Sequence, residues 1–488
     1  MNQIRGVAPA RPAAGNAWGH PRPLWMLLGV TVGLNFAFYG FRAFLAPYIA
    51  QSFYADLGAV AAQRRADLLG SGFLALMYAT PIVGGYVADR ILGETRALAI
   101  SLWLGVLALG LMAWPTLAGF EWGLALFALA TGLGIPLTVL IGRNYASDDP
   151  RREGGYTLYY LAISLGSFVT PFVCADLVGG RYGYRWGFVA AAAGMALAAL
   201  LFQWRRRTLD PVLPKGARPR GPAATAWVLL AIAALLYPTA VLLAYPQVLR
   251  GAMYVLMGVL VLYFAIACAR RRDRVQTQRY LALLLLFAGL VVFWALSLQG
   301  VTSLNFLARD HVDAPWDFSW FQSANPLFIL LFAPFLALLW PWLERRGRDP
   351  STPRKFGIGL LLVALSYGVL VYAIDHLRHA DGRIGWWPLL LCYLLQTLGE
   401  LALSPIGYAL VGQLAAPEEA SLAMGGWFFG IALAYQLAGW IATLTAGAGT
   451  GLAGYGQVYG HLFAWGLLAA LAFLLATPLV RRLMHGVR

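Results

Sequence analysis

The feature that most constrains this sequence is a series of apolar runs that recur from Leu24 to Val480, each long enough to cross a bilayer as a helix of roughly 20 residues. One of them, TVGLNFAFYGFRAFLAPYIA at residues 31–50, carries a single cation, Arg42, in its middle. Of the 488 residues 60% are hydrophobic and only 12% are charged, whereas a soluble domain has about 25% charged residues. The sequence therefore predicts an all-α polytopic membrane protein without a large soluble domain.

The apolar runs predict about 14 transmembrane helices. They are expected near residues 24–50, 70–92, 97–117, 121–142, 156–178, 186–204, 225–246, 251–269, 280–302, 320–343, 356–375, 386–412, 420–445 and 459–480. The predicted organisation is an N-terminal tail (1–23), a six-helix bundle (24–204), a linker (205–224), an inserted two-helix hairpin (225–269) and a second six-helix bundle (280–482). Two such halves are typical of a major facilitator fold, whose substrate binds between the halves near mid-membrane.

The formal charge of +15 comes largely from basic residues in alternate short loops, a pattern that sets membrane orientation. These loops span 88–96, 142–155, 205–221, 269–279 and 344–355. The distribution argues against a nucleic-acid partner, and we expect these loops and both termini to be cytoplasmic, in a cell (inner) membrane. Residues 1–23 have no apolar core, so the first span is expected to act as the insertion signal.

Residue types that commonly carry chemistry are scattered. The cysteines, Cys174, Cys268 and Cys392, fall in different apolar spans without the spacing of a disulfide framework or a metal site. The histidines lie at span ends or in loops, where they are commonly solvated. The chain has no Walker A, zinc-protease or nucleophile-elbow motif. We therefore expect no enzyme activity, cofactor or metal, which leaves transport, reception or scaffolding.

The loop after the second predicted span, GGYVADRILGETR, places Asp89, Arg90 and Arg96 at its cytoplasmic end. An acid and a base at this point can bond to a neighbouring helix end, and such a loop can gate the movement of two helical halves. A solvated turn whose positive charge stops translocation explains the same residues equally well. We keep Asp89 and Arg90 as candidate gating residues.

Five segments, in the right order, resemble the proton-dependent oligopeptide transporter (POT/PTR) family of the major facilitator superfamily. FYGFRAFLAPYIA is similar to the family's first helix, and LALMYATPIVGGYVADRILGETR is similar to its second helix and the following loop. YASDDPRREGGYTLYYLAISLGSFVTP resembles the fifth-helix signature, and LLQTLGELALSPIGYALV resembles the tenth helix. WFQSANPLFILLFAPFLALLWPWLERRGRDPSTPRKF is similar to the eighth helix and its loop.

The chain departs from the family pattern at several charged positions. The first helix of the family bears ExxER before the FYG segment, where this sequence has Thr31, Leu34 and Asn35. The FWxxxEQ motif of the seventh helix reads FWALSLQ here, with Leu298 in place of the acid, and the fourth-helix lysine is absent from GLGIPLTVLIG. The presumed proton-coupling cluster is therefore lost, and the sequence leaves proton coupling open.

The resemblance implies a substrate site at two surviving charges of opposite sign. In the family, the arginine equivalent to Arg42 helps to hold a peptide's carboxylate, and the glutamate equivalent to Glu400 receives its amino terminus. An ionised group in a membrane span normally faces a water-filled cavity or a partner, and the guanidinium fork suits a carboxylate. Glu400 is also the candidate proton-coupling residue, with a structural bond to Arg42 as the alternative. The further predicted substrate-binding residues are Tyr39, Tyr78, Ser164, Gln299, Asn325 and Trp427.

The leading hypothesis is a secondary transporter of di- and tripeptides or related zwitterionic compounds that works by alternating access. The alternatives are a proton-independent facilitator, an exporter of a peptide-like metabolite, and a receptor or scaffold that kept the fold without transporting. The expected partners are a peptide or small-molecule substrate, protons where coupling survives, and the lipid bilayer around a monomer. The substrate, direction and stoichiometry of transport are not encoded in any motif that we recognise.

Overall fold

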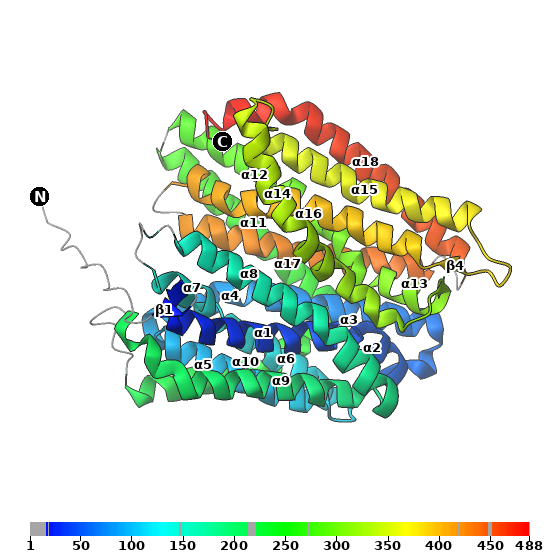
Figure 1. The fold of residues 1–488 in the computed structure, drawn as a ribbon, viewed down its shortest axis with the longest axis horizontal. Helices are drawn as coiled ribbons and strands as arrows, with labels where there is room; N and C mark the ends of the chain where they lie inside the picture. The colour runs from blue at the N-terminus through cyan, green and yellow to red at the C-terminus, as the bar shows by residue number, and fades with distance from the viewer. Residues whose placement is uncertain are drawn as a thin grey trace, which may run out of the picture. The chain divides into compact units, whose positions relative to one another are not determined.

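The computed structural model describes residues 16–17, 19–145, 149, 151–212, 221–271, 273–416, 420–447 and 451–487, and its backbone is almost entirely helical (Figure 1). Thirteen helical segments are long and apolar enough to cross a membrane, and Trp387–Leu403 is a shorter apolar stretch of a further long helix. The number of predicted spans agrees with this set.

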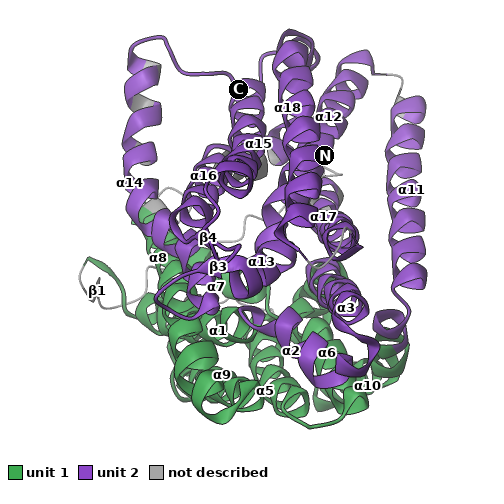
Figure 2. Cartoon of the chain, turned by 90° about the vertical axis from the view of Figure 1, so that its right-hand side faces the viewer, with its two compact units in different colours: residues 1–41, 80–240 green, residues 42–79, 241–488 purple. Residues whose placement is uncertain are grey.

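These residues form two compact units, which Figure 2 shows in different colours. Unit 1 comprises residues 1–41 and 80–240, and unit 2 comprises residues 42–79 and 241–488. The units do not coincide with the predicted bundles, because residues 42–79 group with the second half of the chain and the predicted hairpin is divided after Ala240.

Unit 1 contains the first helix and most of the predicted N-terminal bundle. Its elements are β1 (Asn16–Ala17), β2 (His20–Pro21), α1 (Arg22–Arg42, whose last residue belongs to unit 2), α4 (Pro81–Val87), the π-helical turn η2 (Ala88–Leu92), α5 (Glu94–Met112), α6 (Leu117–Gly132), α7 (Pro136–Arg143), α8 (Arg151–Thr170), the π-helical η3 (Pro171–Gly180), α9 (Tyr184–Arg205), the 3-10 turn η4 (Arg206–Val212) and α10 (Pro222–Ala244, in unit 1 as far as Ala240).

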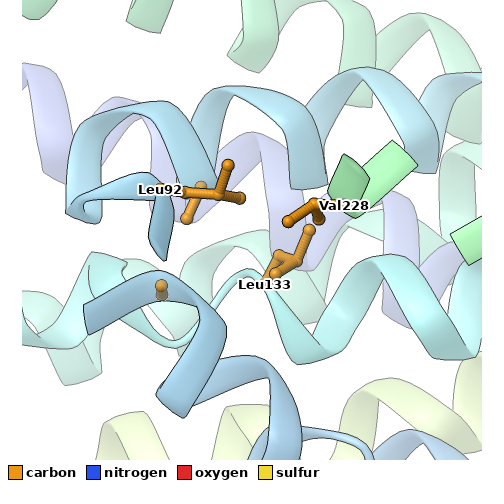
Figure 3. Packing of buried hydrophobic residues seen from close by; sticks show 5 residues of the cluster. Leu92, Leu133 and Val228 are labelled. Atoms are coloured by element: carbon orange, nitrogen blue, oxygen red, sulfur yellow. The ribbon is translucent and has the colours of Figure 1, made fainter. Parts of the chain in front are cut away.

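A buried apolar cluster fixes the first helix of the predicted hairpin within unit 1. Leu92 of η2, Leu133 after α6 and Val228 of α10 meet there, together with Ala88 and Ala97 (Figure 3). Nearby, the Arg96 guanidinium of α5 donates a 3.1 Å hydrogen bond to the Thr225 hydroxyl of α10. Burial of large apolar side chains is worth about 1.5–3 kcal/mol each, so α10 is held by packing as well as by this bond.

Unit 2 contains the rest of the chain. Its elements are α2 (Leu45–Phe53), the 3-10 turn η1 (Ala55–Leu57), α3 (Ala59–Ala79), α11 (Pro246–Arg271), α12 (Arg274–Ser297), the 3-10 turn η5 (Leu298–Val301), α13 (Ser303–His311), β3 (Val312–Asp313), the 3-10 turn η6 (Phe318–Ser323), α14 (Ala324–Arg345), α15 (Thr352–His376), β4 (Ile384–Gly385), α16 (Trp387–Leu414), α17 (Ala420–Gly447) and α18 (Leu452–Leu483). The short strands β3 and β4 pair in parallel.

Two helices from different ends of the sequence, α3 and α17, pack against each other within unit 2 (Figure 2). Ser71 of α3 lies against Gly439 of α17, and Gly72 lies against Gln436, so the two helices run antiparallel. A Cβ atom at Gly439 would overlap with the Ser71 side chain. Small residues at these positions therefore allow the two backbones to approach closely.

The first two predicted spans are wrong in detail. The predicted helix 24–50 is interrupted, because α1 ends at Arg42 and α2 begins at Leu45. The predicted span 70–92 begins too late, because α3 starts at Ala59 and the helical path continues through α4 and η2. Residues 59–69 contain two arginines and an aspartate, and this charge concealed the helix from a hydropathy pattern.

Candidate functional site

The break after Arg42 has a local cause in Pro47. A proline has no backbone N–H and its ring crowds the carbonyl four residues earlier, which is that of Ala43. That carbonyl instead accepts a 3.0 Å hydrogen bond from Nδ2 of the buried Asn305, on α13. The chain therefore leaves the helix directly after Arg42, and α13 stabilises the freed backbone group.

Arg42 is half-buried and lines a small pocket of unit 2. The rest of the lining consists of Leu45 and Ala46 of α2, Ala66, Gly70 and Leu74 of α3, Val301 of η5 and Thr302. The positive charge of Arg42 acts on two groups of α16, the Glu400 carboxyl and the Tyr393 hydroxyl. The two charges that the sequence predicts to form the substrate site thus lie in one electrostatic environment within unit 2.

Glu400 is oriented by an amide from α14. Nδ2 of Asn325 donates hydrogen bonds to Oε2 of Glu400 at 2.8 Å and to the hydroxyl oxygen of Thr397 at 3.0 Å. Thr397 lies three residues before Glu400 on α16, so both acceptors lie on one face of that helix. Asn325, one of the predicted site residues, thus contacts Glu400 directly.

Two residues that the sequence reasoning missed extend this group. Nε2 of Gln322 donates a 2.5 Å hydrogen bond to the Gly300 carbonyl, which also accepts a 3.2 Å bond from the Tyr393 hydroxyl. Tyr393 lies seven residues before Glu400 on α16, and Gln322 lies three residues before Asn325. Helical spacing from the two recognised residues was the signal available for finding them.

Gln299 has a different environment from the one expected of a substrate-binding residue. Its side chain is fully buried, and its Nε2 donates to the carbonyls of Ala295 and Ala438 at 3.1 and 3.0 Å. Its Oε1 accepts from the hydroxyls of Thr302 and Ser303 at 3.4 and 2.8 Å. These four bonds use the full capacity of the amide, so Gln299 connects α12 to α17 and has a structural role in this conformation.

The two predicted aromatic residues of unit 2 have different surroundings. Tyr78 of α3 lies against Tyr435 of α17, with ring centroids 5.2 Å apart. Trp427 is buried next to Phe356 and lines an apolar groove with α11 and α12 residues such as Leu260 and Phe287. The structure therefore places Trp427 among apolar side chains of the helix packing.

Two predicted site residues, Tyr39 and Ser164, belong to unit 1. The Tyr39 ring makes an edge contact with Phe38 at 5.1 Å, and the Ser164 side chain is buried. One and two turns before Tyr39, the Asn35 amide donates to the Thr31 carbonyl and the Thr31 hydroxyl donates to the Leu27 carbonyl, both at 2.8 Å. The residues at the ExxER positions therefore bond to their own helix.

The predicted gating residues are exposed, and neither forms an ion pair with another described residue. The ion pair at this end of unit 1 joins Glu94, the first residue of α5, to Arg143, the last residue of α7. Nε of Arg143 donates to both carboxylate oxygens of Glu94, at 2.9 and 2.7 Å. This bidentate ion pair is a strong interaction that connects α5 to α7. Glu94 lies in the loop that the sequence singled out, but the sequence did not predict its pairing with Arg143.

The arrangement in unit 2 combines the guanidinium of Arg42 at the end of α1, the amide of Asn325 at the start of α14 and the carboxyl group of Glu400 in the middle of α16. Such a set can bind one anionic and one cationic group of the same small molecule. Fold and site together define a polytopic membrane transporter.

Comparison with known proteins gives the family. The model described as the POT family matches residues 96–458, so the chain belongs to the POT family and has the major facilitator fold. It is 32% identical to the peptide transporter YePEPT of Yersinia enterocolitica, covering 88% of this chain and 89% of that protein. It is 29% identical to dipeptide and tripeptide permease A of Erwinia pyrifoliae, covering 96% of each.

A solved structure gives the same result for the fold. A POT family transporter in complex with 5-aminolevulinic acid superimposes with a TM-score of 0.83 and 25% identity, covering 97% of this chain and 100% of that chain. The chain is therefore a multi-pass membrane transporter and not an enzyme.

Proposed function

We propose that this protein is a secondary active transporter of di- and tripeptides or related zwitterionic compounds. The names of its relatives support a peptide substrate, and the ligand of the solved transporter, 5-aminolevulinic acid, has an amino group and a carboxylate in one small molecule. Because the family to which the chain belongs is a transporter family, the receptor and scaffold alternatives lose their main support.

The observation that carries the proposal is the pair of opposite charges, Arg42 and Glu400, in unit 2. The guanidinium of Arg42 binds the substrate carboxylate through two parallel hydrogen bonds. The Glu400 carboxylate, oriented by Asn325, binds the substrate ammonium group. A zwitterion satisfies both protein charges at once, whereas a ligand with one charge leaves the other unsatisfied. The site therefore selects for both termini of a short peptide.

The mechanism that we propose is alternating access between the bundles 24–204 and 280–482, with the hairpin 225–269 at the periphery. The basic loops support an orientation with both termini in the cytoplasm. In this proposal the protein is a monomer in the cell (inner) membrane. Asp89 and Arg90, in the basic loop after the second span, belong to the cytoplasmic gate in this proposal. Tyr39, Tyr78 and Ser164 remain proposed contacts of the substrate.

Proton coupling is a separate question within this proposal. The back-bonded side chains of Thr31 and Asn35 favour a carrier that does not use the first-helix cluster. Such a carrier is either a facilitator, which only equilibrates its substrate, or a symporter that takes its proton elsewhere. Glu400 is one candidate for that role, because the arrival of a substrate ammonium group displaces a proton from a carboxyl group.

Uptake of a labelled dipeptide into proteoliposomes of the purified protein tests the proposal. We expect saturable entry above that of protein-free liposomes, inhibited by other dipeptides and much less by an acetylated or amidated dipeptide, which lacks one charge. Accumulation above the external concentration only under an inward proton gradient identifies a symporter. Saturable entry that ignores the gradient identifies a facilitator. Dipeptide entry that does not saturate contradicts peptide transport, and so does the absence of any entry.

A further inference from the structure

One buried polar group of unit 2 that the site described above does not use is the carboxyl group of Asp67, on α3. Asp67 is fully buried, and neither carboxyl oxygen has a hydrogen-bond partner in the described part of the chain. Its backbone carbonyl lies 3.2 Å from the position of a Cβ on Gly439, so this turn of α3 is pressed against α17. The carboxyl group therefore lies in the packed region between two helices of the membrane domain.

The elements that pack against α3 bring no cation to Asp67. The sequence of α17 has no Asp, Glu, Lys, Arg or His, and its facing polar groups are Tyr435 and Gln436. On α3 itself Arg64 is three residues before Asp67, but it is exposed and its guanidinium lies against Gly447 at the end of α17. Other titratable groups around α3 are Arg65 on the same helix, which is exposed, Arg42, whose pocket Ala66 and Gly70 line, Tyr48 of α2, Asp56 of η1, Arg250 and Tyr254 of α11, Arg309, Asp310 and His311 of α13, and Tyr455 of α18.

An ionised carboxylate in these surroundings is strongly disfavoured. Moving such an ion into a protein interior costs several kcal/mol even after relaxation, and a partner must offset that cost. A neutral carboxyl group loses only the hydration of a polar group, which costs about 1–3 kcal/mol on mutational scales. With α3 packed on α17, the neutral carboxyl group is therefore the form that costs less to bury.

Asp67 nevertheless lies close to water-accessible space. One turn earlier on the same helix, Nε2 of Gln63 donates a 3.3 Å hydrogen bond to the Tyr455 hydroxyl, and Tyr455 interacts electrostatically with Asp67. Gln63 and Tyr455 line a cavity of about 390 Å³ that also includes Asp310 and His311. The helix turn of Ala66 and Gly70 borders the Arg42 pocket. Asp67 is therefore one helical turn from a residue that lines this cavity.

We propose that Asp67 is a proton-binding site of this transporter, and that closure of α3 onto α17 requires a proton on its carboxyl group. In the open arrangement, water in the cavity hydrates an ionised Asp67, and a proton from that side neutralises it. When α3 then closes onto α17, the proton stays on Asp67. Its later release toward the Arg42 pocket leaves Asp67 ionised again. The coupling role of Asp67 rests on the proposed transport function. It would allow proton coupling in a chain that lacks the ExxER residues.

Infrared difference spectroscopy tests proton binding without any substrate. The purified full-length protein is titrated with base, and the carbonyl stretch of a protonated carboxyl group is followed in wild type, Asp67→Asn and Asp56→Asn. Asp56 is an exposed carboxylate near the same end of α3, so Asp56→Asn is the matched control. We expect a band that disappears at high pH in wild type and in Asp56→Asn, and is absent from Asp67→Asn. Equal bands in all three proteins overturn the proposal.

Proteoliposome uptake then tests the coupling role. An inward gradient of about one pH unit drives at most about tenfold accumulation per proton. We expect wild type, Asp56→Asn and Asp67→Glu to accumulate labelled dipeptide, and Asp67→Asn to admit it saturably but only to the external concentration. Gradient-driven accumulation by Asp67→Asn contradicts the role. Should wild type show the infrared band but take up no dipeptide, the proton site stands and the peptide assignment fails.

Discussion

Two carboxyl groups of unit 2, those of Glu400 on α16 and Asp67 on α3, lie on long helices and have different surroundings. Glu400 accepts a hydrogen bond from Asn325 and lies in the field of Arg42. Asp67 is fully buried between α3 and α17 without a hydrogen-bond partner among the residues that the structure describes. A polar neighbour therefore orients the first carboxyl group, whereas the second has apolar helix packing around it.

This difference separates two tasks that a single glutamate would otherwise share. A carboxylate that must bind an ammonium group works best when it stays ionised, whereas a proton carrier must exchange between two states. In the mechanism proposed here Glu400 recognises the substrate and Asp67 responds to the position of α3. Variants at the Glu400 site and at the α3–α17 interface test whether the two tasks are separate.

The largest effect is expected from removing both charges of the substrate site. Arg42→Gln combined with Glu400→Leu should lower dipeptide uptake about 100-fold or more, because truncating a buried charged partner costs about 2–5 kcal/mol. Initial rates in proteoliposomes measure this. Arg42→Lys is the matched variant: it keeps the charge, lacks the planar fork, and should retain partial uptake. Unchanged flux and affinity in the double variant contradict the assigned binding groups.

A smaller loss is expected when the carboxylate keeps its charge but loses its orientation. Asn325→Ala removes the 2.8 Å hydrogen bond to Glu400, and a bond to a charged group is worth about 1.5–3 kcal/mol. The apparent KM for dipeptide should rise about tenfold or more, with gradient-driven accumulation still present. Thr397→Val removes only an acceptor of the same amide and should raise KM less. Loss of coupling with an unchanged KM would assign the proton role to this region instead.

Closure of α3 onto α17 can be hindered without touching either carboxyl group. In Gly439→Ala the new methyl group overlaps with Ser71, and such overpacking costs about 1–3 kcal/mol. We expect turnover to fall about tenfold while dipeptide binding to the detergent-solubilised protein persists. Gly460→Ala is the control, because a Cβ there has open space in α18. Equal turnover in both variants means that this interface does not have to close tightly.

The smallest effect is expected at a carboxylate outside the membrane spans. Hydrogen bonds from Arg151 hold the pKa of Asp149 below its usual value, so its contribution to stability is present above the unfolded pKa of about 3.9 and is lost as pH falls through the folded value. Asp149→Asn should therefore leave uptake unchanged and lower the melting temperature slightly at neutral pH. The difference from wild type should vanish in acid. A large uptake defect would add this loop to the transport machinery.

Comparison of prediction and structure separates two kinds of information. Hydropathy predicted the helices well where a span is uniformly apolar, as in α15 and α18. It failed around Asp67, where charge at the start of α3 hides a helix, and after Arg42, where Pro47 breaks one. The motif resemblance selected Arg42, Asn325 and Glu400, which the structure brings into one unit.

The sequence by itself determined the class of this protein, because apolar length and loop charge act on each segment separately and need no knowledge of its neighbours. It also determined which charges survive in the spans. Only the tertiary structure decided what those polar groups do, since the partners of a buried group come from distant helices. Gln299 is satisfied by α17, Glu400 is oriented by α14, and Asp67 faces a helix that has no charged residue to offer it.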